Sequence, residues 1–118
     1  MLPPAARLTR SQDFGLVVRR GRRAGRPRLV VHVLKPDVPT LDSSKVGFVV
    51  SKAVGNSVVR HRVYRRLRHV VRPRLEDMPP GTLVVVRALA PAADASSSEL
   101  AADFSSALRT LLTGKVPR

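Results

Sequence analysis

The clearest periodic pattern in the chain lies between Asn56 and Arg72. Apolar residues recur in this segment with the spacing of one face of an α-helix, at Val59, Val63, Leu67 and Val70. Asn56 or Ser57 can cap the helix, and Pro73 is expected to end it, because proline cannot continue the hydrogen-bond ladder. The segment therefore predicts an amphipathic helix whose apolar stripe packs on a sheet.

A second helix of the same kind is predicted near the end of the chain. Ser96 and Glu99 have the spacing of a capping box, so we expect the helix to begin there and to run to about Thr113, with Gly114 as its stop. Its apolar positions repeat the same pattern, at Leu100, Phe104, Leu108 and Leu111.

A short helix is also predicted from about Ser11 to Arg20. Thr9 and Gln12 have capping-box spacing, Ser11 offers a second N-cap, and Gly21 is well placed as a C-terminal stop. One side of this helix carries the apolar residues Phe14, Val17 and Val18.

Three segments rich in branched residues predict strands at Arg28–Leu34, Lys45–Ser51 and Thr82–Leu89. We expect the first two, joined by a loop of about ten residues, to pair antiparallel. The arginine-rich segment Arg19–Arg28 is broken by glycine and proline and is expected to be a basic loop. The order αββαβα predicts an α+β fold, a small two-layer sandwich with a three- to four-stranded sheet, in which residues 1–118 form a single domain.

Charge divides the chain into two parts. Its 22 Lys and Arg residues exceed its 8 Asp and Glu residues, giving a formal net charge of +14. Residues 1–75 hold 18 of the basic residues and only three of the acidic ones. Arginine is far more common than lysine, and its planar fork binds phosphate through two hydrogen bonds. This asymmetry indicates a polyanionic partner, and it favours nucleic acid over an anionic membrane or an acidic protein.

Composition argues against several other classes of protein. The chain has no cysteine, so a disulfide framework and a thiolate metal site are excluded. Its apolar runs, such as Val84–Val86, are far shorter than the roughly 18 residues that a membrane span needs. The N-terminal stretch lacks the apolar core of a secretory signal, so we expect a cytoplasmic protein. The three histidines have no metal-ligand spacing with a carboxylate, and paired carboxylates are missing from the basic region, so we expect neither a metal site nor acid–base catalysis in the protein itself.

The polar face of the 56–72 helix is basic throughout. The border of its apolar stripe carries a ridge of Arg60, Tyr64 and Arg68. The opposite arc carries Arg62, Arg65, Arg66, His69 and Arg72. No acidic residue lies between Lys45 and Arg74, and charges of one sign cost stability unless an anion neutralises them. Free backbone N–H groups around Ser57–Val59, with Lys52 just upstream, add a predicted phosphate site at the start of the helix.

The segment from Lys52 to Arg68 resembles the signature of the bacterial ribonuclease P protein component, which reads K-x-x-G-N-x-x-x-R-N-R-x-K-R-x-x-R. The residues that match this pattern are Lys52, Gly55, Asn56, Arg60, Arg62, Arg65 and Arg68. His61 stands at the position of the family's central asparagine, and Tyr64 at that of its following lysine. The resemblance extends to Arg7, Leu8, Asp13 and Phe14 and to the segment Val46–Lys52, so it covers nearly the whole chain.

The resemblance implies a protein that assists a catalytic RNA in removing the 5′ leader of precursor tRNA. The RNA would perform the hydrolysis with bound Mg²⁺, and one protein would bind each catalytic RNA. The residues implied to contact that RNA are Lys52, Asn56, Arg60, His61, Arg62, Tyr64, Arg65 and Arg68. The leader cleft, between the sheet and the first helix, is implied to hold Phe14, Val18, Val30 and His32. Strand alternation independently puts the last two on one face.

The resemblance also implies a left-handed crossover from the second predicted strand through the basic helix to the third, against the right hand that generic rules favour. A ribosomal or other structural RNA-binding protein with a similar fold is the alternative. A DNA-binding module is disfavoured, because no second helix lies at helix-turn-helix spacing from 56–72. We expect the arginines of 19–28 to add less specific contacts to RNA phosphate.

Overall fold

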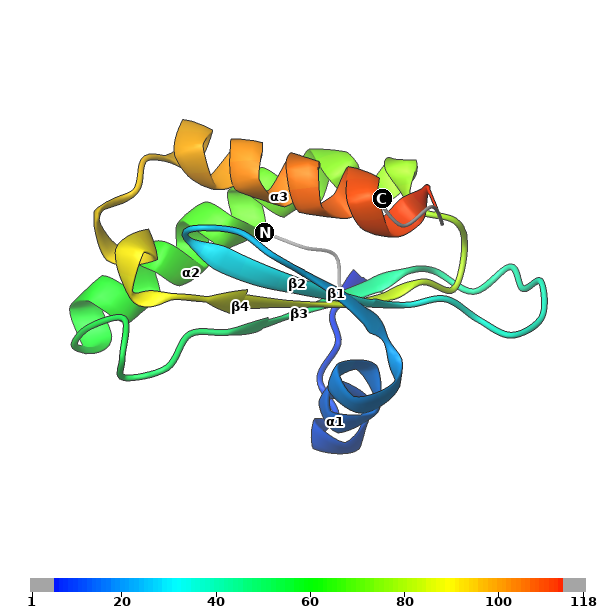
Figure 1. The fold of residues 1–118 in the computed structure, drawn as a ribbon. Helices are drawn as coiled ribbons and strands as arrows, with labels where there is room; N and C mark the ends of the chain where they lie inside the picture. The colour runs from blue at the N-terminus through cyan, green and yellow to red at the C-terminus, as the bar shows by residue number, and fades with distance from the viewer. Residues whose placement is uncertain (1–5, 114–118) are drawn as a thin grey trace.

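The structure, a computed structural model, describes residues 6–113 and consists of a four-stranded sheet with helices on both faces (Figure 1). The helices are α1 (Ser11–Arg20), α2 (Ser57–Val71) and α3 (Ser97–Leu112). The strands are β1 (Arg22–Gly25), β2 (Leu29–Leu34), β3 (Lys45–Val49) and β4 (Leu83–Ala88). Two short 3-10 helices, η2 (Arg72–Asp77) and η3 (Ala90–Asp94), follow α2 and β4. The predicted α+β class is confirmed.

The strands lie in the order β1-β2-β4-β3, with β4 antiparallel to β2 and parallel to β3. The predicted antiparallel pairing of the strands at Arg28–Leu34 and Lys45–Ser51 is therefore wrong, because β4 lies between them. The three consecutive valines Val84–Val86 are buried on both faces of the sheet, which suits a central strand, whereas β3 begins with the exposed Lys45. Burial on two faces thus fits the position of β4 inside the sheet. The hand of the β3–α2–β4 crossover stays a prediction.

Strand β1 lies within the segment that the sequence predicts to be a basic loop, so that prediction is wrong for Arg22–Gly25. These residues pair antiparallel with β2, with Arg23 opposite His32 and Ala24 opposite Val31. Ala24 is buried, while the arginines before it are exposed. An edge strand tolerates exposed charges, which also discourage pairing with another chain, and this explains why so basic a segment can form a strand.

Helices α2 and α3 cover one face of the sheet, and α1 lies against the other (Figure 1). The apolar stripes predicted for both long helices are confirmed as core. In α2 the side chains of Val63, Leu67 and Val70 are buried and Val59 is partly buried. In α3 all four predicted positions are buried, Phe104 completely. A smaller cluster under α1 joins Val17 to Leu8 and Val85.

Capping confirms two of the predicted helix starts and corrects the third. Asn56 Oδ1 accepts a hydrogen bond from the backbone N–H of Val59 at 3.0 Å, and the capping box of Ser96 and Glu99 is complete. Helix α1 begins after Arg10 without a side-chain cap. Neither a Thr9–Gln12 capping box nor a Ser11 cap forms there.

The chain enters α1 from a backbone contact with β3, where Leu8 N–H donates to the carbonyl of Val46 at 3.0 Å. At the other end of α1, Gly21 N–H donates to the carbonyl of Val17, so the predicted stop is confirmed. Two predictions concern positions outside the described residues. They are the end of the last helix at Gly114 and the absence of a secretory signal at the start of the chain. Among the described residues, no helix is both long and apolar enough to span a bilayer.

Candidate nucleic-acid interface

The polar side chains of α2 form three rows, because residues three or four positions apart lie on one side of a helix. The row beside β3 holds Arg60, Tyr64 and Arg68, and an outer row holds His61 and Arg65. The row beside α3 holds Arg62, Arg66 and His69. The predicted RNA-contacting residues of the helix body are thus divided among three sides, and each side has different neighbours.

The row beside β3 is built around Tyr64. Its ring meets the ring of Phe48 edge to face, with centroids 5.3 Å apart and planes at 66°. The guanidinium of Arg68 lies 4.8 Å from the Tyr64 centroid, in a cation–π contact. The Nε atoms of Arg60 and Arg68 are buried and have no hydrogen-bond partner within the described residues. The row therefore has an aromatic centre flanked by two cations that have no carboxylate partner within residues 6–113.

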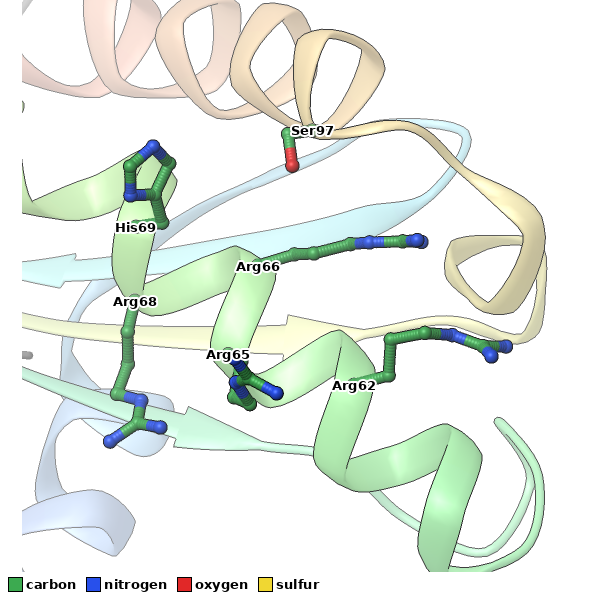
Figure 2. Close-up of a pocket in the computed structure, with 6 residues that line it drawn as sticks. All are labelled: Arg62, Arg65, Arg66, Arg68, His69 and Ser97. Atoms are coloured by element: carbon green, nitrogen blue, oxygen red, sulfur yellow. The ribbon is translucent and has the colours of Figure 1, made fainter.

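The row beside α3 borders a hollow in the surface (Figure 2). The hollow lies between α2 and the first residue of α3, and its lining residues are Arg62, Arg65, Arg66, Arg68, His69 and Ser97. Nη1 of Arg66 donates a hydrogen bond to the carbonyl of Ala95 at 2.8 Å, which ties this arginine to the segment before α3. Figure 2 shows the Arg68 side chain pointing away from Ser97, toward the β3 side of the helix.

The arginines of α2 have no carboxylate partner within residues 6–113. The arginine ion pairs of this part of the chain lie elsewhere: Arg28 pairs with Glu99 at 3.0 Å and with Asp103 at 3.3 Å, and Arg74 pairs with Asp77 at 2.7 Å. The positive charge predicted for this helix is therefore concentrated on its surface without compensation, as expected of a surface that meets a polyanion.

The turn before α2 is fixed by a close approach of the backbone to the helix. Gly55 has φ of 156°, and a Cβ at this position would lie 2.8 Å from Cγ1 of Val59. Asn56 uses its Oδ1 to cap the helix, so the N–H of Val59 is occupied and the predicted phosphate site keeps only the N–H groups of the first helical residues. Lys52 is exposed on the same turn.

The residues predicted for the leader cleft lie on the α1 side of the sheet or on α1 itself. Val30 and His32 face away from the main core, as strand alternation predicts. Phe14 packs against β3 so closely that a Cβ on Gly47 would lie 2.6 Å from its Cε2 atom. Val18 is 48% exposed on α1. Phe14 is thus part of the small core under α1 as well as a candidate contact.

His32 is the most unusual polar residue on this face. Its side chain is only 6% exposed, and its Nδ1 atom has no hydrogen-bond partner within the described residues. It lies directly opposite Arg23 on β1. Arg87 on β4 lies opposite Val30, which is two residues before His32 in β2. Burial is the main cause that lowers the pKa of His32 below its ordinary value, and the charges of Arg23 and Arg87 lower it further. The imidazole is therefore neutral at pH 7.

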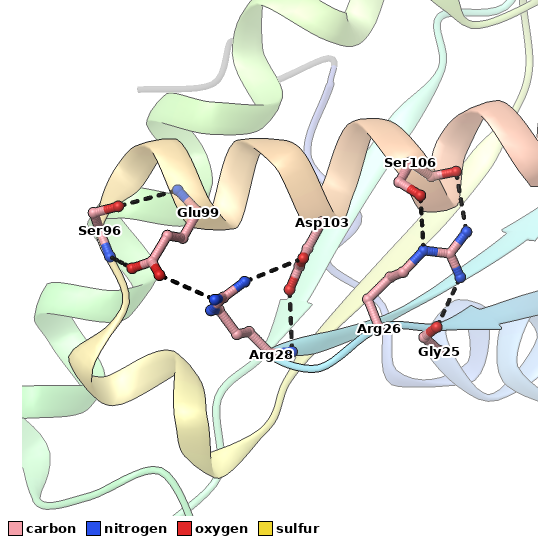
Figure 3. A network of polar contacts seen from close by, with 7 residues as sticks. All are labelled: Gly25, Arg26, Arg28, Ser96, Glu99, Asp103 and Ser106. Carbon is pink, nitrogen blue, oxygen red and sulfur yellow. Dashed lines mark hydrogen bonds and ion pairs between the residues drawn. The ribbon is translucent and has the colours of Figure 1, made fainter.

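Two arginines of the predicted basic loop have structural partners instead of a free surface (Figure 3). Nε of Arg26 donates to Oγ of Ser106 at 2.9 Å, and the same guanidinium reaches the Ser106 carbonyl. Arg28 donates to Asp103 from both its backbone and its guanidinium. The β1–β2 turn is thereby held on α3. The sequence carries no periodic signal for these contacts, since the partners lie at least 75 residues apart.

The fold and the uncompensated cations of α2 define a small α+β protein of the nucleic-acid-binding class. A family model for ribonuclease P matches residues 2–112. The ribonuclease P protein component of Streptomyces griseus is 56% identical over 120 residues, covering 97% of this chain and 98% of that protein. The corresponding protein of a Nocardioides species is 51% identical over 104 residues, covering 88% and 89%. The chain belongs to the ribonuclease P protein family.

Solved structures agree on the fold. The RNase P protein of Staphylococcus aureus superposes with a TM-score of 0.76 at 22% identity, over 89% of this chain and 94% of that one. The RNase P protein of Thermotoga maritima gives 0.72 at 21% identity, over 92% and 97%. Family membership favours the ribonuclease P interpretation over the alternative of a ribosomal or other structural RNA-binding protein.

Proposed function

We propose that this protein is the protein subunit of a ribonuclease P, which binds the catalytic RNA and the 5′ leader of precursor tRNA and assists RNA-catalysed removal of the leader. The observation that carries the proposal is the surface of α2. This chain belongs to the ribonuclease P protein family, and the arginines of α2 have no carboxylate partner among the described residues. We place the protein in the cytoplasm, with one copy on each catalytic RNA.

The contacts to the catalytic RNA are assigned to α2 and the turn before it. The residues are Lys52, Asn56, Arg60, His61, Arg62, Tyr64, Arg65 and Arg68. Their guanidinium groups grip phosphate oxygens, and Tyr64 offers a ring that Phe48 and Arg68 hold in place for stacking on a base. Asn56 contributes mainly by capping the helix, which leaves its amide N–H groups for a ligand.

The leader is assigned to the α1 side of the sheet, where Phe14, Val18, Val30 and His32 lie. Val18 is the exposed apolar member of this set. The two arginines beside His32 supply charge for the leader's phosphates, while the neutral imidazole supplies a hydrogen-bonding group that the protein leaves unpaired. A single-stranded leader suits such a mixture of apolar, polar and cationic groups.

The hydrolysis is assigned to the RNA subunit together with Mg²⁺. Arginine stays protonated in proteins and cannot act as a general base, so the α2 surface can stabilise phosphate charge but cannot activate water. A surface of uncompensated cations also repels a divalent cation, and we therefore place the Mg²⁺ on the RNA. Arginines that relieve phosphate repulsion would allow the RNA to fold with fewer ions.

Reconstitution tests this function. Catalytic RNA and precursor tRNA are mixed at low Mg²⁺ with and without the protein, and cleavage of the leader is followed over a range of Mg²⁺ concentrations. We expect the protein to raise the cleavage rate and to lower the Mg²⁺ midpoint, and the variant Arg60→Ala/Arg62→Ala/Arg65→Ala to lose most of this effect. Identical rates and midpoints with and without the protein would leave only a general RNA binder.

A further inference from the structure

The hollow between α2 and the start of α3 brings together residues that the sequence does not associate (Figure 2). Arg62, Arg66 and His69 form the α3-side row of the basic helix, whereas Ser97 belongs to a helix whose sequence pattern indicates only core packing. Ser97 lies 31 residues beyond Arg66 in the chain, and the fold alone makes them neighbours.

Arg66 is held in place at the edge of this hollow. Its Nη1 donates to the carbonyl of Ala95, a buried residue two positions before Ser97. One bond of this kind restrains the side chain and leaves the other N–H donors of the guanidinium for a ligand. The entropy that a long side chain loses on binding is then partly lost already in the free protein, which favours binding.

The charge of the hollow is positive and has no counterion in its lining. None of the lining residues is acidic. The nearest acid along the chain, Glu99, is engaged elsewhere, because it accepts from the backbone N–H of Ser96 at 2.9 Å and pairs with Arg28. These two contacts lower the pKa of Glu99, so its carboxylate is ionised and already serves the start of α3. Within residues 6–113, the arginines of α2 that line the hollow therefore have no carboxylate partner.

We propose that this hollow binds one backbone phosphate of RNA. Arg62 and Arg66 would grip its oxygens through their forks, and the Ser97 hydroxyl would donate a further hydrogen bond from α3. The inference rests on the proposed function, since it takes α2 as the RNA interface, and it adds that the RNA strand crosses from α2 onto α3. Phosphate contacts carry no base information, so this site sets the position of the RNA and not its sequence preference.

A pair of neighbouring substitutions tests the site. Ser97→Asp puts a carboxylate into the hollow, and Ser98→Asp puts the same charge on an exposed residue that does not line it. Both positions lie in the first turn of α3, where an acidic residue favours the helix, and both variants have the same net charge. Binding to ribonuclease P catalytic RNA is measured at several salt concentrations, and thermal melting checks the fold of each variant.

We expect Ser97→Asp to weaken binding about tenfold or more and to reduce the slope of log affinity against log salt by about 0.7–0.9 per lost phosphate contact. Ser98→Asp is expected to stay within about twofold of the unsubstituted protein at about 0.15 M salt and above, because its carboxylate lies on an exposed residue that does not line the hollow and is screened by salt. Equal affinities of the two variants would overturn the proposal.

Ser97→Ala keeps the test decisive if the aspartate disturbs folding. It removes only the hydroxyl, and we expect a loss of about fivefold in affinity with Ser98→Ala unchanged. No loss for Ser97→Ala together with no difference between the aspartate variants would also overturn the proposal. Failure of the proposed function has a separate signature, in which the unsubstituted protein itself does not bind the catalytic RNA.

Discussion

Arg28 binds Asp103 twice, through its backbone N–H at 3.1 Å and through Nη1 of its guanidinium at 3.3 Å. Asp103 is 8% exposed, so its carboxylate is a nearly buried charge. Both of these contacts come from Arg28, the last residue before β2. The contact fixes the edge of the sheet to α3 and orients the turn that leads into β2, the strand that carries His32.

Replacing Asp103 with Ala is expected to destabilise the protein by about 2–4 kcal/mol, because it leaves the backbone N–H of Arg28 without its acceptor and removes one of the two carboxylates that pair with the guanidinium. Chemical denaturation followed by circular dichroism measures this loss. Asp94→Ala removes the same charge from an exposed position of η3 and should change stability by less than about 0.5 kcal/mol. Similar losses for the two variants would show that the buried contact is unimportant.

The packing of Phe14 on Gly47 predicts that β3 cannot accept a larger residue at this point. A Cβ there would lie 2.6 Å from Phe14 Cε2 and 3.1 Å from Cβ of Leu8, so we expect Gly47→Ala to cost about 1–3 kcal/mol. Gly25→Ala in β1 is a matched control, since its Cβ would meet no atom within 4 Å. Thermal melting compares the two. If Gly47→Ala melts at the same temperature as Gly25→Ala, the Phe14 ring does not pack on Gly47.

His32 predicts a dependence of stability on pH. Its pKa in the folded state lies below the ordinary 6.5, so the unfolded chain binds more protons in the window between the two values. The contribution of the neutral His32 imidazole to the free energy of unfolding is fully present above about pH 6.5, and it is lost as the pH falls through that window. We expect the melting temperature to fall between pH 7.5 and 5.5 for the unsubstituted protein and to fall less for His32→Gln.

His69→Gln is the control for this experiment, because it makes the same substitution at an exposed position. Parallel curves for the unsubstituted protein and His32→Gln would contradict the account of a buried neutral imidazole.

The long helices could be predicted from sequence because their information is local. The apolar stripes that include Leu67 in α2 and Phe104 in α3 repeat every three or four residues. The capping box at Ser96 also joins residues only three positions apart. The same holds for the face of β2 that carries His32, since alternation along one strand decides it.

What could not be predicted depends on contacts between distant segments. The position of β4 between β2 and β3 follows from burial of its valines on two faces, and a short run of valines does not reveal its neighbours. Strand β1 could not be predicted because its arginines and glycine are typical of a loop. The packing of Ala24 in the core, which identifies this segment as an edge strand, is visible only in the folded structure. The hollow at Ser97 has the same origin, since it exists only where α2 and α3 meet.

In the proposed function, the arginines of α2 bind the catalytic RNA through its phosphates. The most direct test is the affinity for that RNA as a function of salt, for the unsubstituted protein, for Arg60→Ala/Arg62→Ala/Arg65→Ala and for the corresponding triple lysine variant. We predict that the alanine variant reduces the slope of log affinity against log salt by about 2–3, as expected for three lost phosphate contacts, while the lysine variant keeps the slope and binds more weakly. An alanine variant with the affinity and slope of the unsubstituted protein would contradict the claim.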